Sequence, residues 1–148
     1  GTIIKHIPGH GLAKVDSHFS TPYINKSLQY LLKNDFKAFK NKNSFFAMTG
    51  HLIFNQIDKV NTVTHSRKMI NIIRKKIGFK NLLISDDLSM KSLKKGLKIN
   101  TIDTFKAGCN LALHCNGKLK EMEIVGKNSP LVSKFIIKKT SQFYNILR

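Results

Sequence analysis

Short apolar runs alternate with segments of helical periodicity along this chain. Each run stops at polar or turn-forming residues, which is typical of buried strands. The alternation of such strands with helices predicts a parallel sheet joined by right-handed crossovers. The four runs predict strands at 2–4, 44–49, 82–85 and 111–115.

Two segments between these strands space their apolar residues three and four positions apart, which predicts amphipathic helices at 27–40 and 66–77. We expect the first helix to break near Asn34-Asp35. In the second, Ser66 is suited to the N-cap and Gly78 marks the C-terminal end. The remaining expectations are an irregular stretch at 52–64, a loop with a short helix at 89–97, and helices at 102–107, 118–126 and 132–147.

Four strand–helix units amount to half of a (β/α)8 barrel. A complete barrel needs about 250 residues, and this chain has 148. We therefore expect an α/β fold with parallel strands that do not close into a barrel. Functional groups of such folds gather at the carboxyl ends of the strands. The polar groups that follow the strands here are Lys5, His6, His51, Asp86, Asp87 and Asn116.

The stretch from Lys5 to Pro22 has the most unusual composition. It holds three histidines, and Asp16 stands two positions before His18, which places an orienting carboxylate beside an imidazole. Turn-breaking residues near its start indicate an irregular loop at a strand end, where catalytic groups concentrate. A solvated surface loop is the plainer interpretation, but it accounts poorly for the run Pro8-Gly9-His10-Gly11.

Asp86 ends the apolar run at 82–85. A carboxylate facing a cleft from a strand end can act as a nucleophile, a base or a metal ligand. If the pleat of the strand continues, Asp87 points to the other face, so one carboxylate of the pair is expected at the site. Hydrogen bonding to nearby backbone amides is the plainer role for Asp87.

The formal net charge is +18, and a charge this high suggests a polyanion partner such as nucleic acid. The lysines are nevertheless scattered through every segment and far outnumber the arginines. This distribution indicates a coding bias acting on solvated positions, so we expect no specific nucleic-acid partner. A basic nucleic-acid-binding module stays the alternative, and it would show steeply salt-dependent affinity.

No apolar run approaches the roughly 20 residues of a membrane span, and no secretory leader is recognised at the start. Cys109 and Cys115 flank an apolar strand and fit neither a metal spacing nor a disulfide framework. This cysteine usage indicates a reducing compartment. We therefore expect a cytoplasmic protein without membrane association.

The motifs together resemble a known family. The run Lys5-His-Ile-Pro-Gly-His-Gly, followed by Asp16-Ser-His18 and Pro22, is similar to a signature of bacterial β-N-acetylglucosaminidases of glycoside hydrolase family 3, the NagZ type. The resemblance covers nearly the whole chain and implies the C-terminal half of a (β/α)8 barrel. Residues 1–148 would then be a partial catalytic domain that lacks the earlier strands. The further matching motifs are Met48-Thr-Gly-His51, Ser66-Arg-Lys-Met-Ile, Leu83-Ile-Ser-Asp-Asp-Leu-Ser-Met90 and Ala107-Gly-Cys-Asn-Leu-Ala-Leu-His-Cys-Asn-Gly117.

The resemblance assigns three catalytic roles. Asp86 matches the nucleophile that forms a covalent glycosyl-enzyme intermediate, His18 matches the acid/base, and Asp16 matches its dyad partner. Most retaining glycosidases use two carboxylates instead. The residues that match or would line the sugar site are Lys5, His6, His51 and Met90, and those of the mobile loop that carries the dyad are Pro8, Gly9, His10 and Gly11.

The activity implied is retaining exo-hydrolysis of terminal, non-reducing N-acetylglucosamine from β-linked muropeptides of cell-wall recycling, without metal or cofactor. Asn110 stands where the family commonly has Asp, which would alter a hydrogen bond of the barrel. A sugar-binding Asp and Arg of the family's earlier strands have no counterpart here. The alternatives are an inactive fragment, a phosphorylase, and a half-barrel that associates with a second copy or with a separate N-terminal half.

Overall fold

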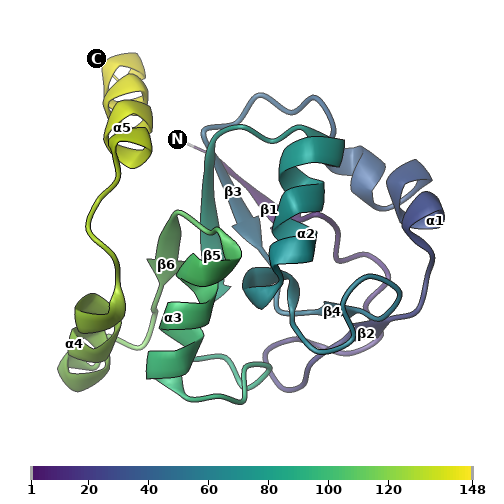
Figure 1. The fold of residues 1–148 in the computed structure, drawn as a ribbon, viewed down its shortest axis with the longest axis horizontal. Helices are drawn as coiled ribbons and strands as arrows, with labels where there is room; N and C mark the ends of the chain where they lie inside the picture. Colours follow the sequence, from purple (N-terminus) through teal and green to yellow (C-terminus); the bar gives the residue numbers. More distant parts are fainter. Residues whose placement is uncertain (1, 148) are drawn as a thin grey trace.

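A computed structural model of the chain describes residues 2–147 (Figure 1). The strands are β1 (Ile3–Ile7), β2 (Tyr23–Ile24), β3 (Phe46–Thr49), β4 (Ile53–Phe54), β5 (Leu82–Asp87) and β6 (Leu111–Leu113). The helices are α1 (Leu28–Lys33), α2 (Arg67–Ile72), α3 (Leu97–Ala107), α4 (Leu119–Asn128) and α5 (Lys134–Ile146), with shorter 3₁₀ turns at Phe36–Phe39 and Val63–His65.

The main sheet has four parallel strands in the order β1-β3-β5-β6. Its strand order and parallel pairing confirm the α/β half-barrel architecture expected from the sequence. Strands β2 and β4 pair in a separate two-stranded parallel sheet. Figure 1 shows α2 and α3 beside the main sheet, while α4 and α5 follow the last strand and α4 contacts α3.

The two faces of the sheet differ in burial. In register, Ile4, Ala47 and Leu83 lie side by side, and they share a buried core with Ile70 of α2 and with Ile73, which directly follows α2. The side chains between them point to the opposite face, where Phe46 is only half-buried. This second face is the one that lines the interior when parallel strands close into a barrel.

The predicted helices near the sheet are largely confirmed. The segment at 27–40 divides at the expected break into α1 and the 3₁₀ turn. Ser66 caps α2, with its Oγ accepting the Met69 N–H at 3.2 Å. A π-helical turn at Ile73–Ile77 continues α2 and ends at Gly78, whose φ of +84° favours glycine.

Three expectations were wrong. The short helix expected at 89–97 is not there, because the described residues from 89 to 96 form turns and loop. The stretch at 52–64 contains β4, which is too short to show an alternating pattern. Helix α3 begins at Leu97, not at residue 102, because its buried face is polar. Asn100, Thr101 and Thr104 are almost fully buried there, so hydrophobic periodicity could not reveal the first turn of the helix.

The last two helices lie at the margin of the fold. Neither α4 nor α5 has a fully buried residue. Helix α5 lies beyond the amino ends of the strands (Figure 1), where Phe143 packs edge-on against Phe46 with ring centroids 4.9 Å apart. Within residues 2–147, no helix combines the length and apolar character needed to cross a bilayer.

Candidate active site

The carboxyl ends of the strands bring an imidazole and a carboxylate together. His6 on β1 places its Nε2 3.4 Å from Oδ2 of Asp86 on β5. Burial lowers the pKa of His6, and the attraction of Asp86 opposes this shift. The ring of His10, in the loop after β1, lies 5.3 Å from the ring of His6. The strand-end residues singled out from the sequence therefore include a contacting pair.

His51, which follows β3, has no exposed surface. Its Nε2 donates to the Asp87 carbonyl at 2.9 Å, because a carbonyl can only accept. Its Nδ1 then accepts from the hydroxyl of Thr64 at 2.8 Å. Burial lowers the pKa of His51, which favours this neutral form. Both ring nitrogens are used inside the protein, so any part that His51 plays in sugar binding would be indirect.

The Asp16–His18 pair has the geometry of an acid/base dyad. Oδ1 of Asp16 accepts the backbone N–H of His18 at 2.8 Å and lies 2.7 Å from its Nδ1. The backbone hydrogen bond, followed by the contact with the imidazole, lowers the pKa of Asp16. The side chains of His18 and Asp16 are 70% and 57% exposed. With Nδ1 directed to the carboxylate, Nε2 of His18 is the nitrogen available for proton transfer.

The other two predicted sugar-binding residues lie at different depths. Lys5 is exposed on β1. Met90 is buried in the turn after β5, where its N–H donates to the carbonyl of Asp87 at 3.2 Å. That turn holds the backbone directly beyond Asp86.

Sequence reasoning missed Asp35, which supports the loop that carries the dyad. Its carboxylate accepts the backbone N–H of Gly11, and burial raises the pKa of Asp35. A Cβ atom at Gly9 would collide with this carboxylate, so glycine is required there by close approach. The helix break at Asn34-Asp35 was visible in the sequence, but no pattern connects it to a loop more than twenty positions earlier.

Asn110, which stands where the family commonly has Asp, accepts two hydrogen bonds in this structure. Its Oδ1 accepts from Nη2 of Arg74 at 2.8 Å and from the N–H of Leu83 at 2.9 Å. Arg74 also donates to the carbonyls of Phe79 and Asn81. The guanidinium thus has neutral acceptors, and burial lowers its pKa. Within residues 2–147, no three His, Cys, Asp or Glu side chains are grouped to share a metal ion.

Parallel strands in this order, with polar side chains meeting at their carboxyl ends, are the arrangement that (β/α)8 enzymes use for their active sites. The glycosyl hydrolase family 3 N terminal domain matches residues 1–140 of this chain. The chain belongs to that family.

Curated relatives and a solved structure agree with this assignment. A beta-hexosaminidase of Histophilus somni (strain 2336) is 30% identical over 144 residues, which are 92% of this chain and 41% of the relative. A beta-hexosaminidase of Haemophilus influenzae is 35% identical over 120 residues, or 76% of this chain and 34% of the relative. The crystal structure of native NagZ from Neisseria gonorrhoeae has a TM-score of 0.79 at 29% identity, covering 93% of this chain and 41% of that one. The chain therefore spans less than half the length of these proteins.

Proposed function

We propose that this chain supplies the nucleophile and the acid/base dyad of a retaining exo-β-N-acetylglucosaminidase. Membership of glycosyl hydrolase family 3 supports the hydrolase class. The observation that carries the proposal is the pairing of Asp86 with His6 at the strand ends, next to a loop that presents Asp16 and His18 as a dyad. Asp86, His18 and Asp16 also stand where the family's motifs have these three groups.

The reaction proceeds in two displacements. A carboxylate oxygen of Asp86 bonds to the anomeric carbon as the glycosidic C–O bond breaks, and protonated His18 gives its proton to the departing oxygen. Water then attacks the anomeric carbon, neutral His18 takes the proton of that water, and the Asp86 carboxylate is released. A neutral base places no second anion beside the nucleophile. Lys5 and His6 hold sugar hydroxyls in this scheme.

Catalysis requires the other strands of the barrel, from the same polypeptide or from another chain. The half-buried inner face of β3 supports this requirement, and so do the outer edges of β1 and β6, which pair with no further strand among residues 2–147. Unpaired strand edges and apolar faces recruit partners. Residues 1–148 would then be the second half of a catalytic domain. The substrate is a muropeptide ending in N-acetylglucosamine, and the compartment is the cytoplasm.

A chimera tests the proposal directly. This chain is joined behind the part of the Histophilus somni relative that precedes the matched region, and turnover of a chromogenic aryl β-N-acetylglucosaminide is measured. We expect turnover in the chimera and none in the isolated chain. Asp86→Asn should reduce turnover on the order of 10³-fold or more. Full turnover of that variant, or a cooperatively folded chimera without turnover, would contradict the proposal.

A further inference from the structure

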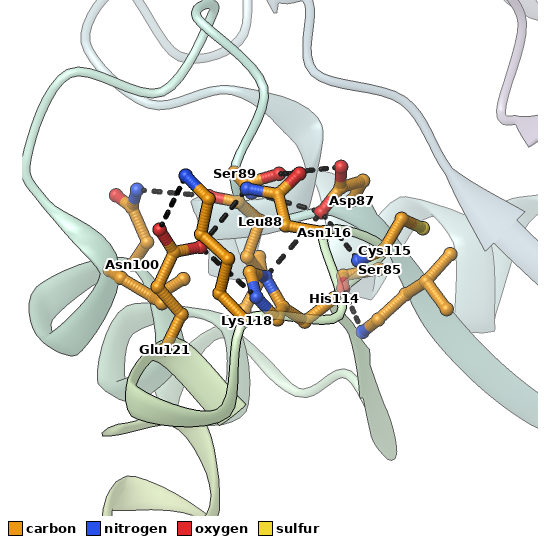
Figure 2. A network of polar contacts seen from close by, with 12 residues as sticks. Ser85, Asp87, Leu88, Ser89, Asn100, His114, Cys115, Asn116, Lys118 and Glu121 are labelled. Carbon is orange, nitrogen blue, oxygen red and sulfur yellow. Dashed lines mark hydrogen bonds and ion pairs between the residues drawn. The ribbon is translucent and has the colours of Figure 1, made fainter. Parts of the chain in front are cut away.

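His114 is a buried imidazole that the proposed reaction does not use. It directly follows β6, and its side chain is 5% exposed. Figure 2 shows it between two carboxylates from different elements. Its Nε2 lies 3.1 Å from Oε2 of Glu121 in the first turn of α4, and its Nδ1 lies 3.9 Å from Oδ1 of Asp87 at the end of β5.

These carboxylates belong to a closed ring of polar contacts (Figure 2). The Oγ of Ser89 lies 2.6 Å from Oδ2 of Asp87. The same Oγ lies 3.2 Å from Oδ1 of Asn116. Nδ2 of Asn116 donates to Oε2 of Glu121 at 3.0 Å, and His114 closes the ring back to Asp87. The ring connects the ends of β5 and β6 to the start of α4.

The charges that face His114 come from two elements. Asp87 approaches from β5 and Glu121 from α4, while Lys118 contacts the far oxygen of Glu121 at 3.5 Å. The buried ring of His114 stands between the two carboxylates and keeps them apart. Neither of its nitrogens makes a hydrogen bond to another described residue, so its place there rests on close contact.

Asp87 connects this ring to the nucleophile. Its carboxylate accepts the N–H groups of Ser89 at 3.0 Å and Cys115 at 3.2 Å, and its carbonyl accepts from His51. Its own N–H donates to Oδ1 of Asp86 at 2.9 Å. A displacement of Asp87 would therefore turn the carboxylate of Asp86.

We propose that His114 is a positioning residue which, through Asp87, holds the carboxylate of Asp86 in the orientation needed for attack. This inference rests on the proposed function of Asp86. His114 is distinct from the acid/base because it contacts Asp87, the residue directly after the nucleophile. Its other contact, Glu121, links α4 to this strand end.

The test compares His114→Gln and His114→Leu with Glu123→Gln, a control on α4 whose carboxylate pairs only with Lys127 among the described ion pairs. In the chimera, we expect both His114 variants to lower kcat on the order of 10- to 100-fold with KM within about twofold, as for a misplaced reacting group. Glu123→Gln should match the parent. The double variant His114→Gln, Asp87→Asn should lose no more than Asp87→Asn alone, because the two residues act in series.

Hydrogen exchange of backbone amides in the isolated chain, resolved by NMR, gives a readout that does not depend on turnover. We expect His114→Gln to speed exchange at Asp87, Ser89 and Cys115 while the amides of β3 keep the parent rates. Unchanged exchange at these three amides would overturn the inference, and so would faster exchange throughout the sheet. A parent chimera without turnover would refute the proposed function, and the exchange rates would still decide whether His114 positions the strand end.

Discussion

Nε2 of His6 lies 3.4 Å from Oδ2 of Asp86, across the strand that separates them in the sheet. The contact joins the first strand of the described sheet to the strand that carries the candidate nucleophile. Burial lowers the pKa of His6, so the imidazole is held mostly neutral and can donate one N–H toward the carboxylate or a sugar hydroxyl. The pair therefore orients Asp86 without cancelling its negative charge.

Gly50 lies in close contact with His6 of this pair. A Cβ atom there would lie 2.8 Å from Cδ2 of Leu52, 3.2 Å from Cδ2 of His10 and 3.3 Å from Cβ of His6. We expect Gly50→Ala to lower the free energy of unfolding by about 1 kcal/mol through overpacking and to disturb the His6–Asp86 contact.

Gly126→Ala is the matched control for this substitution. Gly126 lies within α4 with open space around it, so alanine should stabilise the chain by about 0.5–1 kcal/mol. Urea unfolding of both variants measures whether the free energy of unfolding falls for Gly50→Ala and rises for Gly126→Ala. Equal stabilisation by the two alanines would show that the packing around Gly50 is looser than the structure indicates.

The sequence was sufficient to predict those helices and strands whose ends are marked by local residue patterns. Ser66 and Gly78 marked the ends of a helix, and the apolar run before Asp86 marked β5. Helix α3 was misplaced because Asn100 and Thr101 occupy its buried face. Asp35 and His114 were missed as site residues because their partners come from distant elements. Periodicity reports which face of an element is buried, but not which side chain meets which across the fold.

Acid should destabilise the fold through His65. Burial, with a smaller contribution from His51, lowers the pKa of His65 from 6.5 to about 4. Between these values the unfolded chain binds the proton and the folded chain does not, so stability falls as pH decreases from 6.5 to about 4. The loss attributable to this residue is about 3 kcal/mol.

His65→Gln isolates this contribution, because glutamine keeps a donor for the Asn100 carbonyl that His65 contacts at 3.1 Å. Urea unfolding of the parent and the variant is compared at pH 7 and pH 4. We expect the parent to lose more stability than the variant over this range. Parallel pH curves would exclude His65 as the source.

Asp35 should show the opposite pH dependence. Burial raises its pKa, so the folded chain binds the proton more tightly and the contribution of Asp35 to stability falls as pH rises. Asparagine keeps an acceptor for the Gly11 N–H without the charge. We expect Asp35→Asn to raise Tm at pH 7 and the gap to the parent to close in acid.

Asp58→Asn is the control, because the pKa of Asp58 is shifted in the opposite direction to that of Asp35. Burial raises the pKa of Asp58, but hydrogen bonds from Ser66, Asn61 and Val60 outweigh this effect, and the net pKa is lowered. This substitution should therefore lower Tm at pH 7. A Tm that falls for both variants would show that the charge of Asp35 stabilises the loop.

Asn110→Asp should strengthen the contact between residue 110 and Arg74 and so stabilise the fold. Arg74 donates to the amide oxygen of Asn110 at 2.8 Å, and a carboxylate would convert this contact to a charge-assisted pair, worth about 1 kcal/mol more than the neutral bond. We expect the free energy of unfolding to rise by that amount at pH 7 and the gain to disappear when the carboxylate is protonated. No gain at pH 7 would mean that the cost of burying the new charge offsets the pairing.

The most direct measurement is covalent trapping of the nucleophile. The chimera is incubated with a fluorinated N-acetylglucosaminyl fluoride, which forms the glycosyl-enzyme rapidly and releases it slowly, and its peptides are then analysed by mass spectrometry. We predict one added fluorinated sugar per chain on the peptide that contains Asp86, and none in Asp86→Asn. A sugar attached to another residue, or rapid turnover with no labelled intermediate, would contradict the assignment of Asp86.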